Sequence, residues 1–266
     1  MTFEAFEHKD LKCLKELQPP EWGDLTPRFS YFIESDFCRP VKLLVNNEIV
    51  GIGTDILHED TAWLACIIVH PNHRNKGLGS LITQKLIDII DKKKFQTIYL
   101  DATDLGYPVY KKIGFESETQ YSHLKLAQPL SPLELSNSIT EFKEKYREQI
   151  LKLDREVSGE NRFATLAPHI LSSKVFIHSH QVEGFYMPTL GDGLIIAQNS
   201  HAGMELMKYR FQSKSHAVLP LDNKKGMKYL TQNKYVQFRT SCRMRLGKRR
   251  EVQLNNIYNR ISGQLG

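Results

Sequence analysis

A short loop constrains the fold of this chain more than any other segment. Residues 70–80, HPNHRNKGLGS, hold two glycines, an arginine and a lysine. The apolar run at residues 63–69 predicts a buried strand before the loop, and after it apolar residues recur at helical spacing: Leu81, Ile82, Leu86, Ile89 and Ile90. The chain is therefore expected to pass from a strand through a glycine-containing loop into a helix. Unpaired backbone N–H groups and the helix dipole make such a helix N-terminus a site for an anion.

Length, charge and cysteine content narrow the class of protein. The 266 residues suffice for one large domain or for two domains of about 130 residues. A formal net charge of +6 suits an anionic ligand or a nucleic acid, although surplus surface lysines give the same balance. No apolar run approaches the about 18 residues of a membrane span, and residues 1–17 lack the apolar core of a signal peptide. Four scattered cysteines and ten histidines without metal-ligand spacing indicate reduced thiols and no metal site, so we expect a cytoplasmic protein with no membrane partner.

The first part of the chain predicts a mixed α/β (α+β) domain with a mixed sheet at residues 1–128. Helices are predicted at residues 3–18, around 29–33, from the loop to about 93, and within 106–115. Strands are predicted at residues 41–45, 49–57, 63–69, 97–100 and 118–126, with Asn46-Asn47-Glu48 as a hairpin turn.

The rest of the chain predicts a second domain at residues 133–266 with a similar plan. Residues 127–138, AQPLSPLELSNS, are rich in proline and serine and predict a linker. Helices are predicted at 138–157, 201–211 and 223–235, and strands at 175–177, 184–187, 191–199, 215–222 and 236–246. Residues 98–126 and 217–246 both read as strand, aspartate, short helix and strand, which indicates a divergent internal repeat.

Two sequence motifs, the glycine loop and the later segment at residues 100–115, together resemble the acetyl-coenzyme A site of the GNAT acyltransferase superfamily. The loop fits the pattern V-x-P-x-x-R/Q-x-x-G-x-G/A through Val69, Pro71, Arg74, Gly77 and Gly79. Residues 100–115, LDATDLGYPVYKKIGF, resemble the second half of that site through Tyr110, Gly114 and Phe115. The whole layout also resembles two-domain bacterial GNAT proteins with a degenerate second copy. The resemblance implies tandem GNAT-like acyl-CoA N-acyltransferase domains and acetyl-coenzyme A as co-substrate.

The resemblance also implies which residues hold the cofactor. The expected cofactor-binding residues are Ile68, Val69, Arg74, Asn75, Lys76, Gly77, Leu78, Gly79, Ser80 and Tyr110. Consecutive N–H groups would wrap the pyrophosphate, and the glycines remove side chains that would hold it away. The pantetheine arm would pair with the strand near Val69, where it separates from the strand at residues 97–100.

The implied chemistry is direct transfer of an acetyl group to a primary amine. In this N-acetyltransferase reaction Tyr110 would protonate the departing thiolate, and a carboxylate or histidine would act as general base. The candidates for the base are His58, Glu59, Asp60, Asp101 and Asp104. Asp101 ranks first because it ends the strand nearest the expected thioester. A covalent route through Cys66 is disfavoured, since this residue lies mid-strand and packs as a small apolar side chain.

The sequence indicates less about the acceptor and the residues that would bind it. Trp22 lines an acceptor pocket or anchors two helices. Asp154 and Arg162 are the other substrate-site candidates: Arg162 binds an acidic acceptor or the domain partner, or it forms a structural ion pair. The second half lacks the Arg-x-x-Gly-x-Gly run, so we expect it to cover the acceptor cleft and set specificity. Small amines, amino acids, antibiotics and protein N-termini all remain open, and the oligomeric state is not readable. Two alternatives are a non-catalytic acyl-CoA sensor and a basic nucleic-acid-binding protein using residues 243–250, RMRLGKRR.

Overall fold

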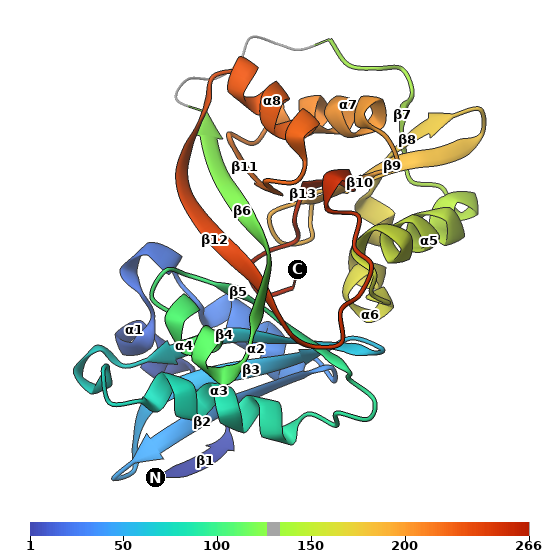
Figure 1. Cartoon of the computed structure of the whole chain (residues 1–266). Helices are drawn as coiled ribbons and strands as arrows, with labels where there is room; N and C mark the ends of the chain where they lie inside the picture. Colours follow the sequence, from blue (N-terminus) through green and yellow to red (C-terminus); the bar gives the residue numbers. More distant parts are fainter. Residues whose placement is uncertain (127–133, 266) are drawn as a thin grey trace. The chain divides into compact units, whose positions relative to one another are not determined.

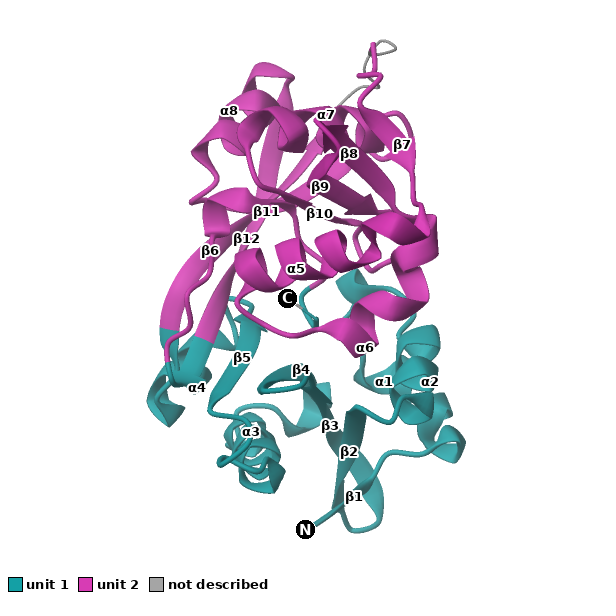
Figure 2. Ribbon diagram, turned by 90° about the vertical axis from the view of Figure 1, so that its right-hand side faces the viewer, with its two compact units in different colours: residues 1–116, 245–248, 263–265 teal, residues 117–244, 249–262, 266 magenta. Residues whose placement is uncertain are grey.

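The computed structural model describes residues 1–126 and 134–265, which form two compact units (Figure 2). Unit 1 comprises residues 1–116, 245–248 and 263–265, and unit 2 comprises residues 117–244 and 249–262. Most of the predicted linker, residues 127–133, lies outside the described residues. The division into domains at 1–128 and 133–266 stays a prediction.

Unit 1 is built on a mixed sheet, which confirms the predicted fold class. Its strands follow the order β1 (Thr2–Ala5), β2 (Cys38–Val45), β3 (Glu48–Leu57), β4 (Thr61–Val69) and β5 (Thr97–Ala102), then the end of β12 (Tyr235–Gly247). β1 to β4 pair antiparallel, whereas β4 and β5 are parallel. Beside β5, the N–H of Lys248 donates to the Gln96 carbonyl at 2.8 Å.

Helices lie on both faces of this sheet. One face is covered by η1 (His8–Cys13), α1 (Leu14–Leu17), η2 (Pro20–Trp22) and α2 (Thr26–Glu34), with the core between α2 and β4 holding Phe29, Phe32 and Trp63. The other elements are η3 (Pro71–His73), α3 (Leu78–Ile89) and α4 (Tyr107–Ile113). α3 buries Ile82 and Leu86 and lies on the viewer's side of the sheet in Figure 1.

Two predictions in unit 1 were wrong in part. The predicted helix at residues 3–18 begins instead as strand β1, in which Phe3 pairs with Leu43 of β2. α3 ends at Ile89 instead of residue 93, because Ile90 adopts an extended conformation. The predicted hairpin between β2 and β3 is confirmed, and Asn46 and Asn47 take the positive φ angles (50° and 65°) that such a turn requires.

Unit 2 contains strands in two sheets. The first has the order β12, β6 (Glu116–Leu126) and β11 (His216–Pro220), and the second has the order β13 (Ile257–Asn259), β10 (Leu194–Ala197), β9 (Gln181–Met187), β8 (Lys174–His178) and β7 (Ile139–Glu141). The helical elements are η4 (Glu144–Tyr146), α5 (Arg147–Ser158), α6 (Phe163–Leu166), η5 (Ala167–Ser172), α7 (Ser200–Phe211), α8 (Lys224–Gln232) and η6 (Leu254–Asn256). The core of this unit includes Leu206 and Met207 of α7 packed against Ile195 of β10.

The predicted helix at residues 138–157 was also wrong at its start. Residues 139–141 form β7, which pairs with β8, and the helix α5 begins only at Arg147. The strand–helix–strand order expected of the internal repeat is present in both segments, as β5–α4–β6 and β11–α8–β12. No helix in residues 1–126 or 134–265 is long and apolar enough to cross a membrane.

Candidate active site

The glycine loop leads from the end of β4 into the N-terminus of α3. Asn75 and Gly77 adopt positive φ angles of 61° and 76°, which turn the backbone into the helix. Gly77 is the N-cap, and its carbonyl accepts the first helical hydrogen bond from the N–H of Leu81 at 3.1 Å. The N–H groups of Leu78, Gly79 and Ser80 therefore precede the first helical donor and have no partner within the helix.

The space above this loop is open. A Cβ atom on Gly77 would meet no atom within 4 Å, and one on Gly79 would have only the Val69 side chain at 4.0 Å. An open volume in front of consecutive N–H donors at a helix N-terminus fits the pyrophosphate of a nucleotide cofactor. Packing therefore does not require glycine at position 79, where a ligand explains the missing side chain better, whereas the positive φ of Gly77 favours glycine by itself.

The basic side chains of the loop fold back onto its own backbone. Nε of Arg74 donates to the Val69 carbonyl at 3.2 Å, and Nζ of Lys76 lies 3.3 Å from the Asn72 carbonyl. Both residues are exposed. They brace the loop and add positive charge near it, while the backbone amides supply the donors that face the open space.

Strand β4 carries a bulge that the sequence did not predict. Ile52 of β3 pairs with Ile68 and Thr54 pairs with Ala65, so two residues of β4 lie opposite one residue of β3. Cys66, in the bulge, has a φ of 49°, which is rare for a residue other than glycine.

The parallel pairing between β4 and β5 ends before either strand does. The parallel pairing described for these strands spans Thr61–Trp63 and Thr97–Tyr99, whereas β4 runs on to Val69 and β5 to Ala102. The second half of β4 thus presents backbone groups that an extended ligand arm can pair with, in line with the place expected for pantetheine.

Tyr110 and Asp101 meet near this bulge. Because Tyr99 pairs with Trp63 in parallel, Asp101 lies level with Ala65, next to Cys66. Burial raises the pKa of Tyr110, and the nearby Asp101 and Cys66 raise it further, so the phenol is protonated at neutral pH. The Tyr110 ring packs over Gly106, where a Cβ would come within 2.7 Å of Cε2.

The other candidate bases lie elsewhere in unit 1. His58, Glu59 and Asp60 form the turn between β3 and β4, at the opposite end of the nine-residue β4 from the loop. At about 3.3 Å per residue, the five residue steps from Asp60 to Ala65 separate that turn from the level of Asp101 by roughly 16 Å. Asp104 is exposed in the turn before α4. Of the five candidates, Asp101 is the one that the structure places beside Tyr110.

Arg28 of α2 is a neighbour of the bulge that sequence reasoning missed. Burial raises the pKa of the Cys66 thiol to about 11, and the Arg28 guanidinium beside it partly opposes this shift. A thiol with this pKa is protonated at neutral pH, which supports the expectation that Cys66 is not a nucleophile. Arg28 belongs to no motif, and only the packing of α2 on the sheet brings it there. Trp22 is partly buried and packs against the same core cluster, which fits the anchoring alternative for this residue.

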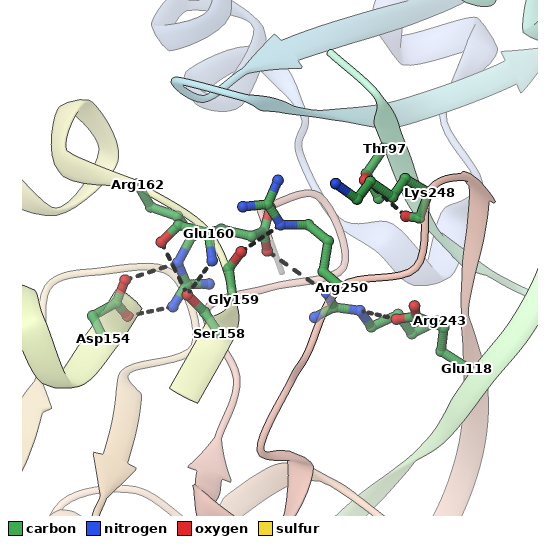
Figure 3. A network of polar contacts seen from close by, with 10 residues as sticks. All are labelled: Thr97, Glu118, Asp154, Ser158, Gly159, Glu160, Arg162, Arg243, Lys248 and Arg250. Carbon is green, nitrogen blue, oxygen red and sulfur yellow. Dashed lines mark hydrogen bonds and ion pairs between the residues drawn. The ribbon is translucent and has the colours of Figure 1, made fainter. Parts of the chain in front are cut away.

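The remaining predicted site residues lie in unit 2 as a buried ion pair. Arg162 donates to the Asp154 carboxylate through Nη2 at 2.5 Å and Nε at 3.2 Å, and both side chains are 3% exposed (Figure 3). Nearby, Nε of Arg243 donates to Glu118 at 3.1 Å. This is the structural alternative that the sequence left open. An acceptor role for Asp154 and Arg162 stays a prediction, and it requires the pair to open.

Within the described residues there is no group of His, Cys, Asp and Glu side chains suited to a metal ion. All four cysteines are free, so no disulfide constrains either unit.

Comparisons with known proteins agree with this geometry. Residues 3–115 match the acetyltransferase (GNAT) family. The [ribosomal protein bS18]-alanine N-acetyltransferase of Haemophilus influenzae is 34% identical over 77 residues, which are 28% of this chain and 53% of that enzyme. The glucosamine 6-phosphate N-acetyltransferase of Trypanosoma brucei brucei is 30% identical over 60 residues, 23% of this chain and 41% of that enzyme. The chain thus spans about half the length of these relatives or less.

Solved structures extend the likeness over the whole chain. A protein from Pyrococcus horikoshii described as a candidate acetyltransferase has a TM-score of 0.83 and 21% identity, covering 100% of this chain and 95% of that one. A GCN5-related N-acetyltransferase from Sphaerobacter thermophilus has a TM-score of 0.62 and 13% identity, covering 96% and 98% of the two chains. At these identities the likeness shows the fold alone.

Proposed function

Because residues 3–115 match the acetyltransferase (GNAT) family, we propose that this protein transfers the acetyl group of acetyl-coenzyme A directly to the primary amine of an acceptor. One observation carries the proposal: a single strand, β4, holds the bulge beside Tyr110 and Asp101 and ends at the open glycine loop. One extended ligand lying along β4 can therefore bind its phosphates at the glycine loop and react at the bulge.

In this proposal unit 1 binds the cofactor mainly through its backbone. The amides of Leu78, Gly79 and Ser80 hold the pyrophosphate, while Ile68 and Val69 pair with the pantetheine arm. This arrangement carries the thioester back along β4 toward Cys66. There the backbone N–H groups of the bulge can donate to the thioester carbonyl and stabilise the oxyanion that forms on it.

The acyl transfer then needs two proton movements. The amine nitrogen attacks the carbonyl carbon, the carbon–sulfur bond breaks, and the thiolate takes the proton of the Tyr110 hydroxyl. Asp101 accepts the proton that the amine loses, directly or through water. Because Asp101 lies close to Tyr110, that proton can return to the phenolate and restore both groups.

The acceptor is proposed only as a class. The two relatives are named for an alanine of a ribosomal protein and for glucosamine 6-phosphate, and both acceptors present a primary amine. We assign unit 2 to acceptor selection, since its sequence lacks the cofactor loop.

The test is a calorimetric titration of the full chain with acetyl-coenzyme A, with Gly79→Ala and Gly79→Glu as variants. We expect the wild type to bind one equivalent, Gly79→Ala to bind about tenfold more weakly, and Gly79→Glu to lose binding because a carboxylate opposes the phosphates. Alanine favours the helix by up to about 1 kcal/mol over glycine, so Gly79→Ala should retain or raise the melting temperature. Failure of a folded wild type to bind would refute the cofactor site. Release of free thiol with a panel of amines then measures turnover.

A further inference from the structure

Unit 2 contains a second polar site, centred on His123. It is formed by Tyr121, His123 and Lys125 of β6, by Phe238, Arg239 and Ser241 of β12, and by Arg260, and is named here the His123 cluster. Its residues are linked by contacts within unit 2 alone, and none of them takes part in the proposed acetyl transfer.

The histidine at its centre is neutral and fixed in one tautomer. Nη2 of Arg239 lies 3.3 Å from Nδ1 of His123, and Nε2 of His123 lies 3.0 Å from Oγ of Ser241. Because a guanidinium can only donate, Nδ1 accepts, so Nε2 carries the hydrogen and donates to Ser241. Burial lowers the pKa of His123 to about 3, and Arg260, Arg239 and His216 contribute to the same shift. The ring therefore adds no positive charge and leaves Arg239 facing a neutral acceptor.

Two of the three cations of the cluster, Arg239 and Lys125, differ from other arginines of unit 2, whereas Arg260 has Asp192 Oδ2 at 3.8 Å from its Nε. Arg162 and Arg243 each have a carboxylate partner, Asp154 and Glu118 respectively. For Arg239 and Lys125, by contrast, the described part of the chain offers no ion pair. Arg239 contacts His123, and Nζ of Lys125 lies 5.5 Å from the centre of the Phe238 ring. Two neighbouring cations without counter-charges create a positive potential that attracts an anion.

The cluster also contains a buried hydroxyl without a hydrogen-bond partner among the described residues. The Tyr121 side chain is 1% exposed, and its hydroxyl has no hydrogen-bond partner among residues 1–126 and 134–265. Leaving a buried hydroxyl unpaired costs about 1–3 kcal/mol, which a bound acceptor oxygen would recover. The Arg260 guanidinium stacks on this ring at 5.0 Å and also reaches Oγ of Ser241 at 3.4 Å.

An apolar wall completes the site. Phe238 is 55% exposed, although a side chain of this size is usually buried. Its ring lies edge-on to His123 with the ring centres 6.1 Å apart. An exposed aromatic surface beside unpaired cations suits a ligand that has both an acid group and an apolar part.

We propose that the His123 cluster is a binding site for the oxyanion group of a small ligand, a carboxylate or a phosphate, whose apolar part packs on Phe238. Arg239 and Lys125 supply the charge, and the Tyr121 hydroxyl supplies a hydrogen bond to the anion. The site uses none of the residues that the proposed acetyl transfer assigns to cofactor binding or to proton transfer, all of which lie in unit 1.

The experiment follows the His123 ring by NMR in the full chain with isotope-labelled histidine, assigned with His123→Gln. The probes are inorganic phosphate, acetate and benzoate, with sodium chloride at equal ionic strength as reference. We expect a saturable shift of the His123 signal with at least one oxyanion and none with chloride. Stronger binding of phosphate than of acetate identifies a phosphate site, and the reverse identifies a carboxylate site. Benzoate binding more tightly than acetate confirms the role of Phe238.

Two variants and a matched control make the result specific. Arg239→Gln should weaken binding about tenfold, as expected for loss of one charge-assisted hydrogen bond, and Tyr121→Phe should weaken it severalfold without lowering the melting temperature. Arg249→Gln removes another exposed arginine of unit 2, outside the cluster, and should leave the binding unchanged. The proposal is overturned if no oxyanion shifts the signal beyond chloride, or if Arg249→Gln weakens binding as much as Arg239→Gln. Acetyl-coenzyme A titration of the same variants reports separately on the proposed function.

Discussion

Tyr110 is the residue whose chemistry is easiest to isolate from its structural role. Its ring packs over Gly106 and edge-on to Phe115, with ring centres 6.0 Å apart, and phenylalanine can keep both contacts. Tyr110→Phe should therefore leave the affinity for acetyl-coenzyme A unchanged while lowering kcat about a hundredfold, the usual contribution of a general acid. Steady-state thiol release gives kcat, and calorimetry gives the affinity.

Tyr107→Phe on the same helix is the matched control and should retain wild-type kcat. An unchanged kcat in Tyr110→Phe would rule out Tyr110 as the proton donor. Binding of acetyl-coenzyme A by the wild type without any turnover would instead favour the acyl-CoA sensor over the enzyme.

The ionisation of Asp55 should make the stability of the protein depend on pH. This β3 residue is fully buried, and neither carboxyl oxygen has a hydrogen-bond partner among the described residues. Burial raises its pKa from the ordinary value of 3.8 to about 8, against the opposing effect of Arg39. Between these two values the folded protein keeps a proton that the unfolded chain releases. The contribution of the protonated Asp55 to the free energy of unfolding is therefore fully present below pH 3.8, and it is lost as the pH rises through about 8.

Asp55→Asn should remove this dependence. Relative to the variant, the free energy of unfolding of the wild type should fall with rising pH by up to about 1.4 kcal/mol per pH unit. Urea unfolding at several pH values in this range measures the difference, with the exposed Asp104→Asn as control. Parallel curves for wild type and Asp55→Asn would show that Asp55 is ionised in the folded protein.

At the level of elements, local signals were readable from the sequence and long-range pairings were not. The loop and α3 could be predicted because glycine, proline and helical periodicity act over a few residues. The edge strands β1 and β7 were missed, because their hydrogen bonds come from β2 and β8. The residues of both strands also fit the start of the helical pattern that follows them. Because the sequence does not show the pairing strand, that pattern led to a predicted helix instead of a strand.

The bulge in β4 marks the limit of sequence reasoning at the candidate site. The residue with the positive φ is Cys66 and not a glycine, so the residue type at this position does not indicate a bulge. The bulge arises from the register between β3 and β4, which only the folded sheet defines. The sequence therefore predicts a phosphate-binding loop, but not the irregular backbone at Cys66 that we propose binds the thioester.

At the level of the whole molecule, the compact units do not follow the order of the chain. The sequence suggests a division at the proline-rich segment 127–138, yet unit 1 includes residues 245–248 and 263–265. Oγ1 of Thr97 donates to the Lys248 carbonyl at 2.8 Å across 151 positions of sequence (Figure 3). A pairing over such a separation leaves no periodic pattern to detect. A chain ending near residue 128 would lack this part of unit 1.

Gly247 provides a direct test of how much this distant segment contributes to stability. Its φ is 89°, and a Cβ there would lie 2.3 Å from the Gln96 carbonyl oxygen, which accepts the hydrogen bond from Lys248. Gly23 also has a positive φ, 67°, but a Cβ there meets nothing within 4 Å. Gly23→Ala should therefore cost only backbone strain, about 1–3 kcal/mol.

Gly247→Ala should cost at least about 2 kcal/mol more, because the backbone must also shift and lose hydrogen bonds beside β5. Urea unfolding of the two variants gives the comparison, and the affinity for acetyl-coenzyme A of the folded Gly247→Ala protein should be unchanged, since the loop lies at the other end of β4. Equal destabilisation by both alanines would mean that unit 1 holds together without residues 245–248. A larger loss for Gly247→Ala would mean that the stability of unit 1 depends on residues that follow residue 116 by more than a hundred positions in the chain.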